Sequence, residues 1–222
     1  MKAKTYILTF FFISLFVLIC SCGSNNTNAQ DTTGTKTKKQ LKEEREARLT
    51  WERLQAKADT AKRYCRDKNF DTNYCMLVDM SVHSGKNRFF VWDFTKDTIA
   101  YSSLCCHGYG KGSSESEPVF SNTPNSYCTS LGKYKTGARS YSNWGINIHY
   151  KLHGLEKTNN KAFDRIIVLH SYGEVPSNEI YPDHLPLGYS QGCPVIDNGV
   201  MTIMDNMLKK TKKPMLLWIY NK

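Results

Sequence analysis

The stretch Gly188-Tyr189-Ser190-Gln191-Gly192-Cys193-Pro194-Val195 decides how the C-terminal part of this chain folds, because it places a cysteine in a tight loop. Gly192 permits backbone conformations that other residues avoid, and Pro194 biases Cys193 toward an extended conformation. Upstream, the apolar run 165–170 predicts a short buried strand that ends on His170, 23 positions before Cys193. The sequence therefore predicts a loop that presents a thiol and a strand that presents an imidazole.

A thiol and an imidazole are two of the four parts that a cysteine nucleophile needs. The imidazole acts as base, a third group orients it, and backbone N–H groups stabilise the oxyanion. The amides of Gly192 and Cys193 are candidates for the last role. Six histidines and eight cysteines allow many chance pairs, so residue types alone do not establish catalysis.

The order of these residues adds a resemblance to a known family. His170 followed by Ser190, Gly192 and Cys193 resembles the signature of the L,D-transpeptidase (YkuD-like) family, in which the cysteine follows Ser-His-Gly or Thr-His-Gly. Gln191 stands where the family usually has its second histidine, and Ile196 where it has Asn or Arg. These departures resemble the murein L,D-transpeptidase lipoprotein branch, in which Ser-x-Gly-Cys-Pro is the norm. Further segments similar to that branch are 84–89, 107–108, 120–122, 130–134, 152–156 and 165–170.

The resemblance implies a mainly β fold, a YkuD-like sandwich with one or two helices, and no cofactor and no metal. It implies Cys193 as nucleophile, His170 as base and acid, and the carbonyl of Ser171 as the group that orients His170. The amides of Gly192 and Cys193 would form the oxyanion hole. Substrate-binding candidates are Ser190, Asn122, His107 and Tyr134. Each of these four also has a structural interpretation, as a residue that closes a loop or ends a strand.

The implied reaction takes place on peptidoglycan stem peptides. Cys193 would attack the bond between the third residue, an L-centred diamino acid, and terminal D-Ala, leaving an acyl-enzyme. A second stem amine would resolve it to a 3→3 cross-link, water would give carboxypeptidase or endopeptidase activity, and a protein amine would give wall anchoring. A non-catalytic peptidoglycan-binding lipoprotein is a further alternative, which Gln191 would fit.

The N-terminus predicts export. Lysines at positions 2 and 4 precede the apolar run 6–20, which is typical of a secretory signal peptide over 1–21. Cys22 follows small Ser21 and is the expected lipidation site, whereas Cys20 follows bulky Ile19. We therefore expect an exported lipoprotein, membrane-anchored and facing the periplasm. No acidic residue follows Cys22 directly, which favours the outer membrane.

Composition divides the remainder into three parts. Residues 22–39 are rich in Ser, Asn, Thr and Gly, which predicts a flexible tether. Residues 40–64 predict a charged amphipathic helix that docks on the domain through an apolar stripe. Residues 65–222 form the catalytic domain, with strands expected at 75–80, 88–94, 98–104, 145–152, 165–170 and 215–220 and a helix at 198–210. The stripe consists of Ala47, Trp51, Leu54, Ala58 and Ala61.

Net charge bears on the macromolecular partners of the chain, and two further histidines bear on metal binding. The charge of +10 is compatible with nucleic acid, a membrane surface or an acidic polymer, but export argues against nucleic acid. His149 and His153 are four apart, as in a helical zinc motif. However, Tyr150 stands where that motif has glutamate, and the segment alternates as a strand, so zinc is disfavoured.

The cysteines leave the disulfide pattern open. Besides Cys22 and Cys193, an exported chain with this composition favours one or two bridges, such as Cys65 to Cys75 or one of the vicinal cysteines 105 and 106 to Cys128. A catalytic Cys193 must stay outside such bridges. We therefore expect a free, accessible thiol at Cys193.

Overall fold

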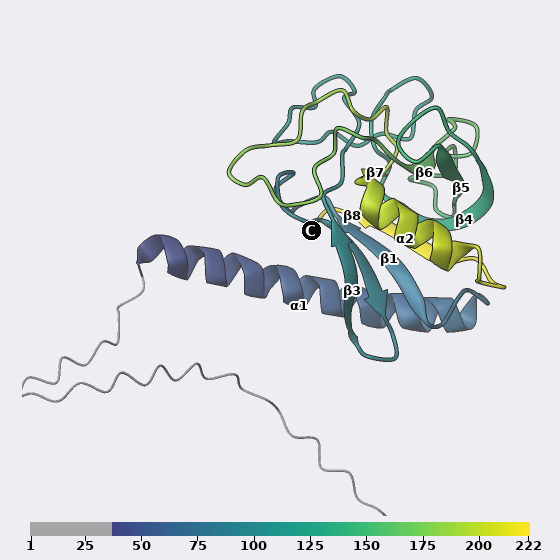
Figure 1. The fold of residues 1–222 in the computed structure, drawn as a ribbon, viewed down its shortest axis with the longest axis horizontal. Coiled ribbons are helices and arrows are strands. Elements are labelled where there is room, and N and C mark those ends of the chain that lie inside the picture. The colour runs from purple at the N-terminus through teal and green to yellow at the C-terminus, as the bar shows by residue number, and fades with distance from the viewer. Residues whose placement is uncertain (1–36) are drawn as a thin grey trace, which may run out of the picture. The chain divides into compact units, whose positions relative to one another are not determined.

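The computed structural model describes residues 37–222, so the predicted signal peptide, Cys22 and most of the tether lie outside the described residues (Figure 1). Eight strands form one sheet in the order β3-β2-β1-β8-β4-β5-β6-β7. The predicted mainly β fold with two helices is confirmed. The elements are α1 (Lys38–Asp67), β1 (Tyr74–Asp79), β2 (Phe89–Asp93), β3 (Thr98–Ser103), β4 (Gly132–Tyr141), β5 (Ile148–Gly154), β6 (Val168–Ser171), β7 (Val195–Ile196), α2 (Asn198–Leu208) and β8 (Leu216–Tyr220).

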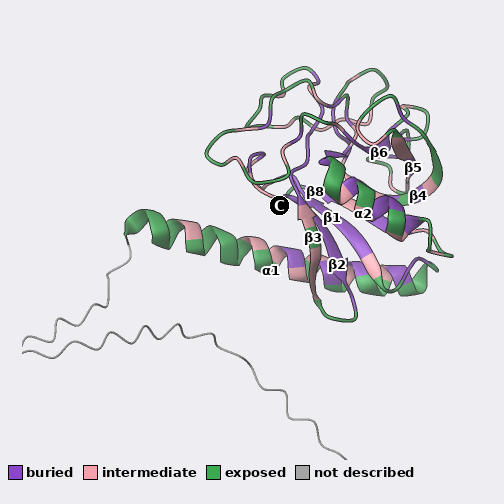
Figure 2. Ribbon diagram, in the orientation of Figure 1, coloured by how far each residue is buried: buried purple, intermediate pink, exposed green. Residues whose placement is uncertain are grey.

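The two helices cover opposite faces of the sheet. Strand β1 shows this, because its successive side chains point to opposite sides. Met76 and Val78 pack in the cluster that contains α2, whereas Cys75 and Leu77 pack in the cluster that contains α1. The alternation of β1 therefore gives the sheet two apolar faces, each closed by one helix. Figure 2 shows β1 buried between them.

Helix α1 is longer than the predicted range 40–64 and docks through the second half of the predicted stripe. Leu54, Ala58 and Ala61 are buried, and the series continues with Cys65. Trp51 is 39% exposed, with its ring centroid 5.4 Å from that of Trp92. Most residues in the first turns of α1 are exposed (Figure 2). The helix is therefore held on the sheet by its second half, where the apolar side chains are buried, and not by the whole predicted stripe.

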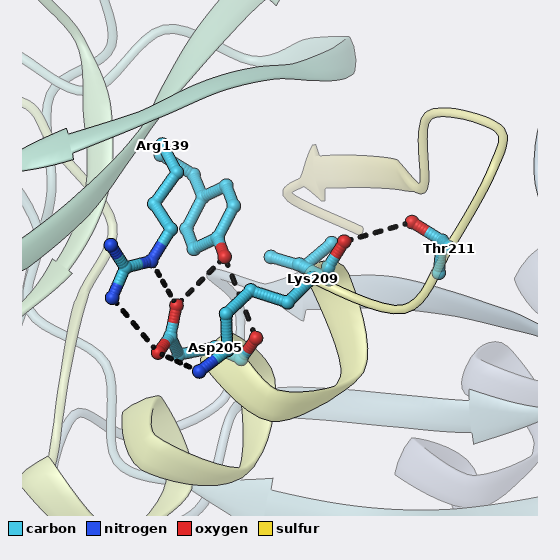
Figure 3. Close-up of polar contacts among 6 residues, drawn as sticks. Arg139, Asp205, Lys209 and Thr211 are labelled. Atoms are coloured by element: carbon cyan, nitrogen blue, oxygen red, sulfur yellow. Dashed lines mark hydrogen bonds and ion pairs between the residues drawn. The ribbon is translucent and has the colours of Figure 1, made fainter.

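Helix α2 is held by a cap and by an ion-pair network. Asp197 is the N-cap and accepts a hydrogen bond from the Val200 amide at 3.0 Å. Asp205 accepts from Arg139 Nε at 2.7 Å and from the Tyr150 hydroxyl at 2.8 Å, and Lys209 Nζ lies 3.0 Å from its other oxygen (Figure 3). This network ties α2 to β4 and β5.

The sheet nearly closes on itself, because the segment after β3 reaches β7. Cys106 forms an antiparallel bridge with Val195, and its amide donates to the Val195 carbonyl at 2.9 Å. Nearby, the Ser103 hydroxyl donates to Asp197 Oδ2 at 2.7 Å. The segments 104–110 and 190–196 are thereby fixed side by side, which positions the loop that carries Cys193.

The cysteines differ from the expectations. The six cysteines of the described residues are free, so the bridges suggested for Cys65, Cys75 and Cys128 are not formed. Apart from Cys193 they are buried, so they pack as small apolar side chains. Within residues 37–222, no helix is long and apolar enough to span a membrane.

Candidate active site

The candidate site lies at the β5–β6–β7 end of the sheet. His170 on β6 pairs with His149 on antiparallel β5 and with Val195 on parallel β7. Because paired residues of neighbouring strands share one face of a sheet, the two histidines point to the same side. Cys193 precedes β7 by two residues, which brings its thiol to the Val168 amide, with Sγ 3.4 Å from that nitrogen. The His170 ring is thus presented by β6, and the thiol by the loop that leads into the neighbouring β7.

His170 is oriented by its own strand. Its Nδ1 lies 3.0 Å from the carbonyl oxygen of Ser171, a distance at which Nδ1–H donates and Nε2 keeps its lone pair. Burial lowers the pKa of His170 below its ordinary 6.5, and the nearby His149 lowers it further, while the Ser171 carbonyl opposes the shift. The ring is therefore neutral near pH 7 and can accept a proton.

Cys193 is a free and partly exposed thiol, as predicted. Besides the Val168 amide, its Sγ contacts the Ile166 carbonyl oxygen at 3.8 Å. Burial raises the pKa of the Cys193 thiol, whereas the Val168 amide and the positive charge of Arg165 lower it. Within the described residues, no hydrogen bond joins the Cys193 thiol to the His170 ring.

The loop that carries Cys193 is clamped by Ser190. The Ser190 hydroxyl donates to the Cys193 carbonyl at 2.6 Å and accepts from the Gly192 amide at 2.9 Å. Gly192 has a φ of 111°, and a Cβ there would lie 2.5 Å from the Cys128 carbonyl oxygen. Any side chain at Gly192 would therefore both strain the backbone and collide with the neighbouring segment. Since the Gly192 amide is bonded to Ser190, it would have to leave that partner to bind an oxyanion.

Arg165 is a site residue that the sequence reasoning missed, since it was interpreted only as the start of a strand. Its guanidinium donates to the carbonyls of Ser121 at 2.9 Å and Cys128 at 2.6 Å, and it also bonds Ser130 Oγ. It thus fixes the 121–130 segment beside Gly192 and places a positive charge near Cys193. A lone arginine before an apolar run carries no signal that would reveal this role.

The start of the predicted strand 165–170 is a turn instead, and β6 begins at Val168. Ile166 has a φ of 57°, a conformation that β-branched residues rarely adopt, and its side chain is 68% exposed. The turn is closed by hydrogen bonds from the amides of Ile166 to Phe163 and of Ile167 to Ala162, at 3.0 and 2.9 Å. The turn directs the Ile166 carbonyl toward Cys193.

His107 is placed differently from His170. It is buried, with Arg88 Nη2 at 2.9 Å from Nδ1 and the Ser114 carbonyl at 2.8 Å from Nε2. Burial, with the positive charge of Arg88, lowers the pKa of His107 to about 4. Because both ring nitrogens are bonded within the protein, this geometry favours the structural interpretation of His107.

Asn122 and Tyr134 are also engaged within the protein. The Asn122 amide donates to the Lys157 carbonyl at 3.0 Å and to Asn160 Oδ1 at 2.8 Å, which links two loops. Tyr134 is fully buried and donates to the Ser130 carbonyl at 2.6 Å, and burial raises its pKa. Neither side chain reaches the thiol through a hydrogen bond among the described residues, so both contacts favour loop closure.

His149 is a second histidine beside His170. Its Nε2 is buried and has no hydrogen-bond partner among the described residues, and burial followed by the charge of Lys151 lowers its pKa. Within residues 37–222, no group of three or more His, Cys, Asp or Glu side chains is arranged to hold a metal ion.

A partly exposed thiol, a neutral imidazole oriented by a carbonyl, and a clamped loop with tight glycine geometry are the groups that cysteine acyl transfer requires. A family model for the L,D-transpeptidase catalytic domain matches residues 45–220. The chain belongs to this family, whose members act on peptidoglycan stem peptides. No curated protein matches the chain.

Solved structures similar to this chain are distant in sequence. Pgp2 from Campylobacter jejuni, a helical cell shape determining protein, is 12% identical with a TM-score of 0.42, covering 72% of this chain and 55% of that one. The K307A mutant of Pgp2 is also 12% identical, with a TM-score of 0.44, and the match covers 69% of this chain and 49% of that one. The L,D-transpeptidase of Xylanimonas cellulosilytica (residues 123–326) is 11% identical with a TM-score of 0.36, covering 71% and 68%. The chain spans about half the length of the Pgp2 chains.

Proposed function

We propose that this protein is a peptidoglycan L,D-transpeptidase with Cys193 as nucleophile and His170 as base and acid. The observation that carries the proposal is the placement, in a family domain, of an oriented, neutral imidazole on β6 and a partly exposed thiol in the loop that leads into the neighbouring β7. The Ser171 carbonyl orients His170, and Ser190 holds the loop. Gly192 is needed because no side chain fits there.

The first half-reaction forms a thioester. His170 Nε2 takes the proton of the Cys193 thiol as Sγ attacks the carbonyl of the L-centred third stem residue. The oxyanion is stabilised by the Cys193 amide, and by the Gly192 amide if it leaves Ser190. Collapse of the intermediate breaks the C–N bond, and His170 returns the proton to the departing amine. Free D-Ala leaves and the acyl group stays on Cys193.

The second half-reaction reverses these proton movements. The side-chain amine of another stem attacks the thioester, a new C–N bond forms, and His170 takes the surplus proton of the amine. The Sγ–C bond breaks and the thiolate regains a proton from His170. The product is a 3→3 cross-link, and neither half-reaction needs a cofactor.

The lowered pKa of His170 and the raised pKa of Cys193 support a resting pair in which both groups are neutral. The ion pair then forms only as the thiol attacks, which suits a base that must return its proton to the leaving amine. Arg165, whose charge lowers the pKa of Cys193, favours the transient thiolate.

A mass measurement of the intact protein tests the proposal. The full-length chain in detergent is mixed with disaccharide-tetrapeptide and quenched in acid at short times. We expect a mass gain equal to the substrate without its D-Ala, absent in Cys193→Ala. Adduct decay to tripeptide without dimers would move the assignment to L,D-carboxypeptidase. Equal binding by both proteins without any adduct or turnover would leave a non-catalytic peptidoglycan-binding protein.

We also propose that the chain is lipidated at Cys22 and anchored in the membrane, with the outer membrane favoured. The support is the apolar run 6–20 and the small residue Ser21 before the cysteine. Labelled palmitate should be incorporated into the wild-type chain in growing cells and not into Cys22→Ala. Label in both proteins would contradict anchoring at this residue.

A further inference from the structure

Three aromatic side chains form a row beside the candidate site. The ring centroids of Tyr189 and Tyr172 are 5.1 Å apart with an interplanar angle of 72°, and those of Tyr172 and Trp144 are 5.6 Å apart at 84°. Edge-to-face pairs of this kind are stable arrangements for aromatic rings. We call Trp144, Tyr172 and Tyr189 the aromatic ladder.

Two members of the ladder, Tyr172 and Tyr189, lie in the chain segments that carry His170 and Cys193. Tyr172 follows His170 by two residues and Tyr189 precedes Cys193 by four. Both tyrosines and Cys193 pack against the same small apolar cluster. The ladder therefore begins in the segments that carry the proposed base and nucleophile.

Trp144 is held in place by the β4–β5 turn. A Cβ on the next residue, Gly145, would lie 2.1 Å from the Ser171 hydroxyl oxygen, so this turn rests directly on Ser171. The Ile146 amide also donates to the Ser171 hydroxyl at 3.1 Å. The outer end of the ladder is thus fixed relative to the residue that orients His170.

The outer end of the ladder is open to solvent. Trp144 is 56% exposed, and Tyr141 at the end of β4 is 69% exposed. A perpendicular neighbour covers at most one face of the indole ring, so at least one face of Trp144 is not covered by Tyr172. Single exposed aromatic residues are common, but a fixed row beside a reactive thiol marks a binding surface.

We propose that the aromatic ladder binds an amino-sugar ring of the peptidoglycan glycan strand that carries the stem peptide. A pyranose ring has an apolar C–H face, which packs on an aromatic face, and a polar rim that seeks hydrogen bonds. This inference rests on the proposed function.

The length of a stem peptide fits this placement. Three extended residues span at most about 11 Å, which is the reach from the sugar to the carbonyl that Cys193 attacks. Tyr172 directly follows β6 and is two residues from His170, roughly 7 Å in extended chain, and the Trp144 ring centroid is 5.6 Å from that of Tyr172. This path of at most about 13 Å from His170 to the Trp144 ring is comparable with the reach of a stem.

The test compares two substrates that differ only in the sugar. The full-length chain in detergent is assayed for D-Ala release from disaccharide-tetrapeptide and from the same tetrapeptide without sugar. We expect Trp144→Ala to raise KM about 10-fold for the disaccharide substrate and to change kcat/KM for the bare peptide less than about 2-fold. Trp144→Tyr should restore most of the affinity. Tyr101→Ala, which removes an exposed ring on β3 outside the ladder, is the matched control.

An equal loss on both substrates, or no loss on either, would overturn the sugar assignment. A binding measurement keeps this inference testable apart from catalysis. The peptide-free disaccharide is titrated into Cys193→Ala and into Cys193→Ala with Trp144→Ala, and binding is followed by saturation-transfer NMR. Binding that depends on Trp144 supports the ladder even if no turnover is found, and its absence from both proteins contradicts it.

Discussion

His107 and His170 occupy two regions that look alike by burial and by electrostatics. Both rings are buried and both have lowered pKa values. His107 uses both nitrogens for Arg88 and Ser114, whereas the hydrogen bond of His170 uses Nδ1 alone, with Ser171. A perturbed pKa therefore marks a candidate base only when a ring nitrogen remains free beside a reactive group.

The largest expected effect follows from this difference. His170→Ala should lower kcat/KM and the rate of Cys193 alkylation by iodoacetamide about 1,000-fold, because the thiol loses its base. His107→Ala should change both rates less than about 3-fold per folded molecule. D-Ala release from disaccharide-tetrapeptide gives kcat/KM, and mass spectrometry of the alkylated protein gives the alkylation rate. Comparable losses in the two variants would remove the distinction between the two histidines.

For stability, the order of the two variants is reversed: His107→Ala should have the larger effect on the free energy of unfolding. His107→Ala leaves the buried Arg88 guanidinium without its ring partner, although the Cys105 carbonyl still accepts from Arg88 Nε at 2.7 Å. We expect the free energy of unfolding to fall by about 3 kcal/mol, since an unpaired buried charge is costly. Urea denaturation measures this value. His170→Ala, which takes no hydrogen-bond partner from a buried charged side chain, serves as the control and should cost about 1 kcal/mol.

A third prediction concerns Asp205, whose contacts tie α2 to β4 and β5 (Figure 3). Asp205→Ala should lower stability at pH 7 by about 2 kcal/mol, because it leaves the Tyr150 hydroxyl unpaired. The hydrogen bond from Arg139 is the largest influence on the Asp205 carboxyl and, together with Tyr150 and Lys209, holds its pKa well below its ordinary 3.8.

A carboxyl group whose pKa is lowered by folding stabilises the folded state. This stabilisation is fully present above the pKa of the carboxyl in the unfolded chain and is lost as pH falls. The difference between wild type and Asp205→Ala should therefore shrink as pH drops below about 3.8. Urea melts at several pH values measure it. A difference that grows in acid would contradict the assigned network.

The smallest expected effect is a pH shift. A base must be neutral, so Cys193 alkylation should lose its His170-dependent rate as pH falls through the lowered His170 pKa, below 6.5. The inflection should stay within about 0.3 units in His107→Ala, since His107 titrates near pH 4. Rates between pH 4.5 and 8 provide the check, and an inflection above 6.5 would contradict the burial argument.

Local sequence signals predicted most of the fold. The predicted strands at 75–80, 88–94 and 98–104 correspond to β1, β2 and β3, of which β1 and β2 pack in the core on both faces. Strand β4 was not predicted, since Gly132–Tyr141 is largely polar in its second half and is exposed there. The turn at Ile166 was missed for the opposite reason: an apolar run predicts a strand, and only tertiary contacts show the turn.

For the site, a short motif located the thiol and the imidazole, but it could not reveal residues that meet only in space. Arg165 contacts the 121–130 segment from more than thirty positions away. His149 lies opposite His170 only through strand register. The cysteine composition predicted bridges, whereas the buried cysteines pack as free thiols.

The most direct test of the central claim is a product analysis. The full-length chain in detergent is incubated with disaccharide-tetrapeptide, beside Cys193→Ala, and the products are separated by liquid chromatography and identified by mass spectrometry. We predict dimers joined through a 3→3 link, with one free D-Ala per dimer, from the wild type and none from the variant. Dimers formed equally by both proteins, or substrate left intact by both, would contradict a transpeptidase that acts through Cys193.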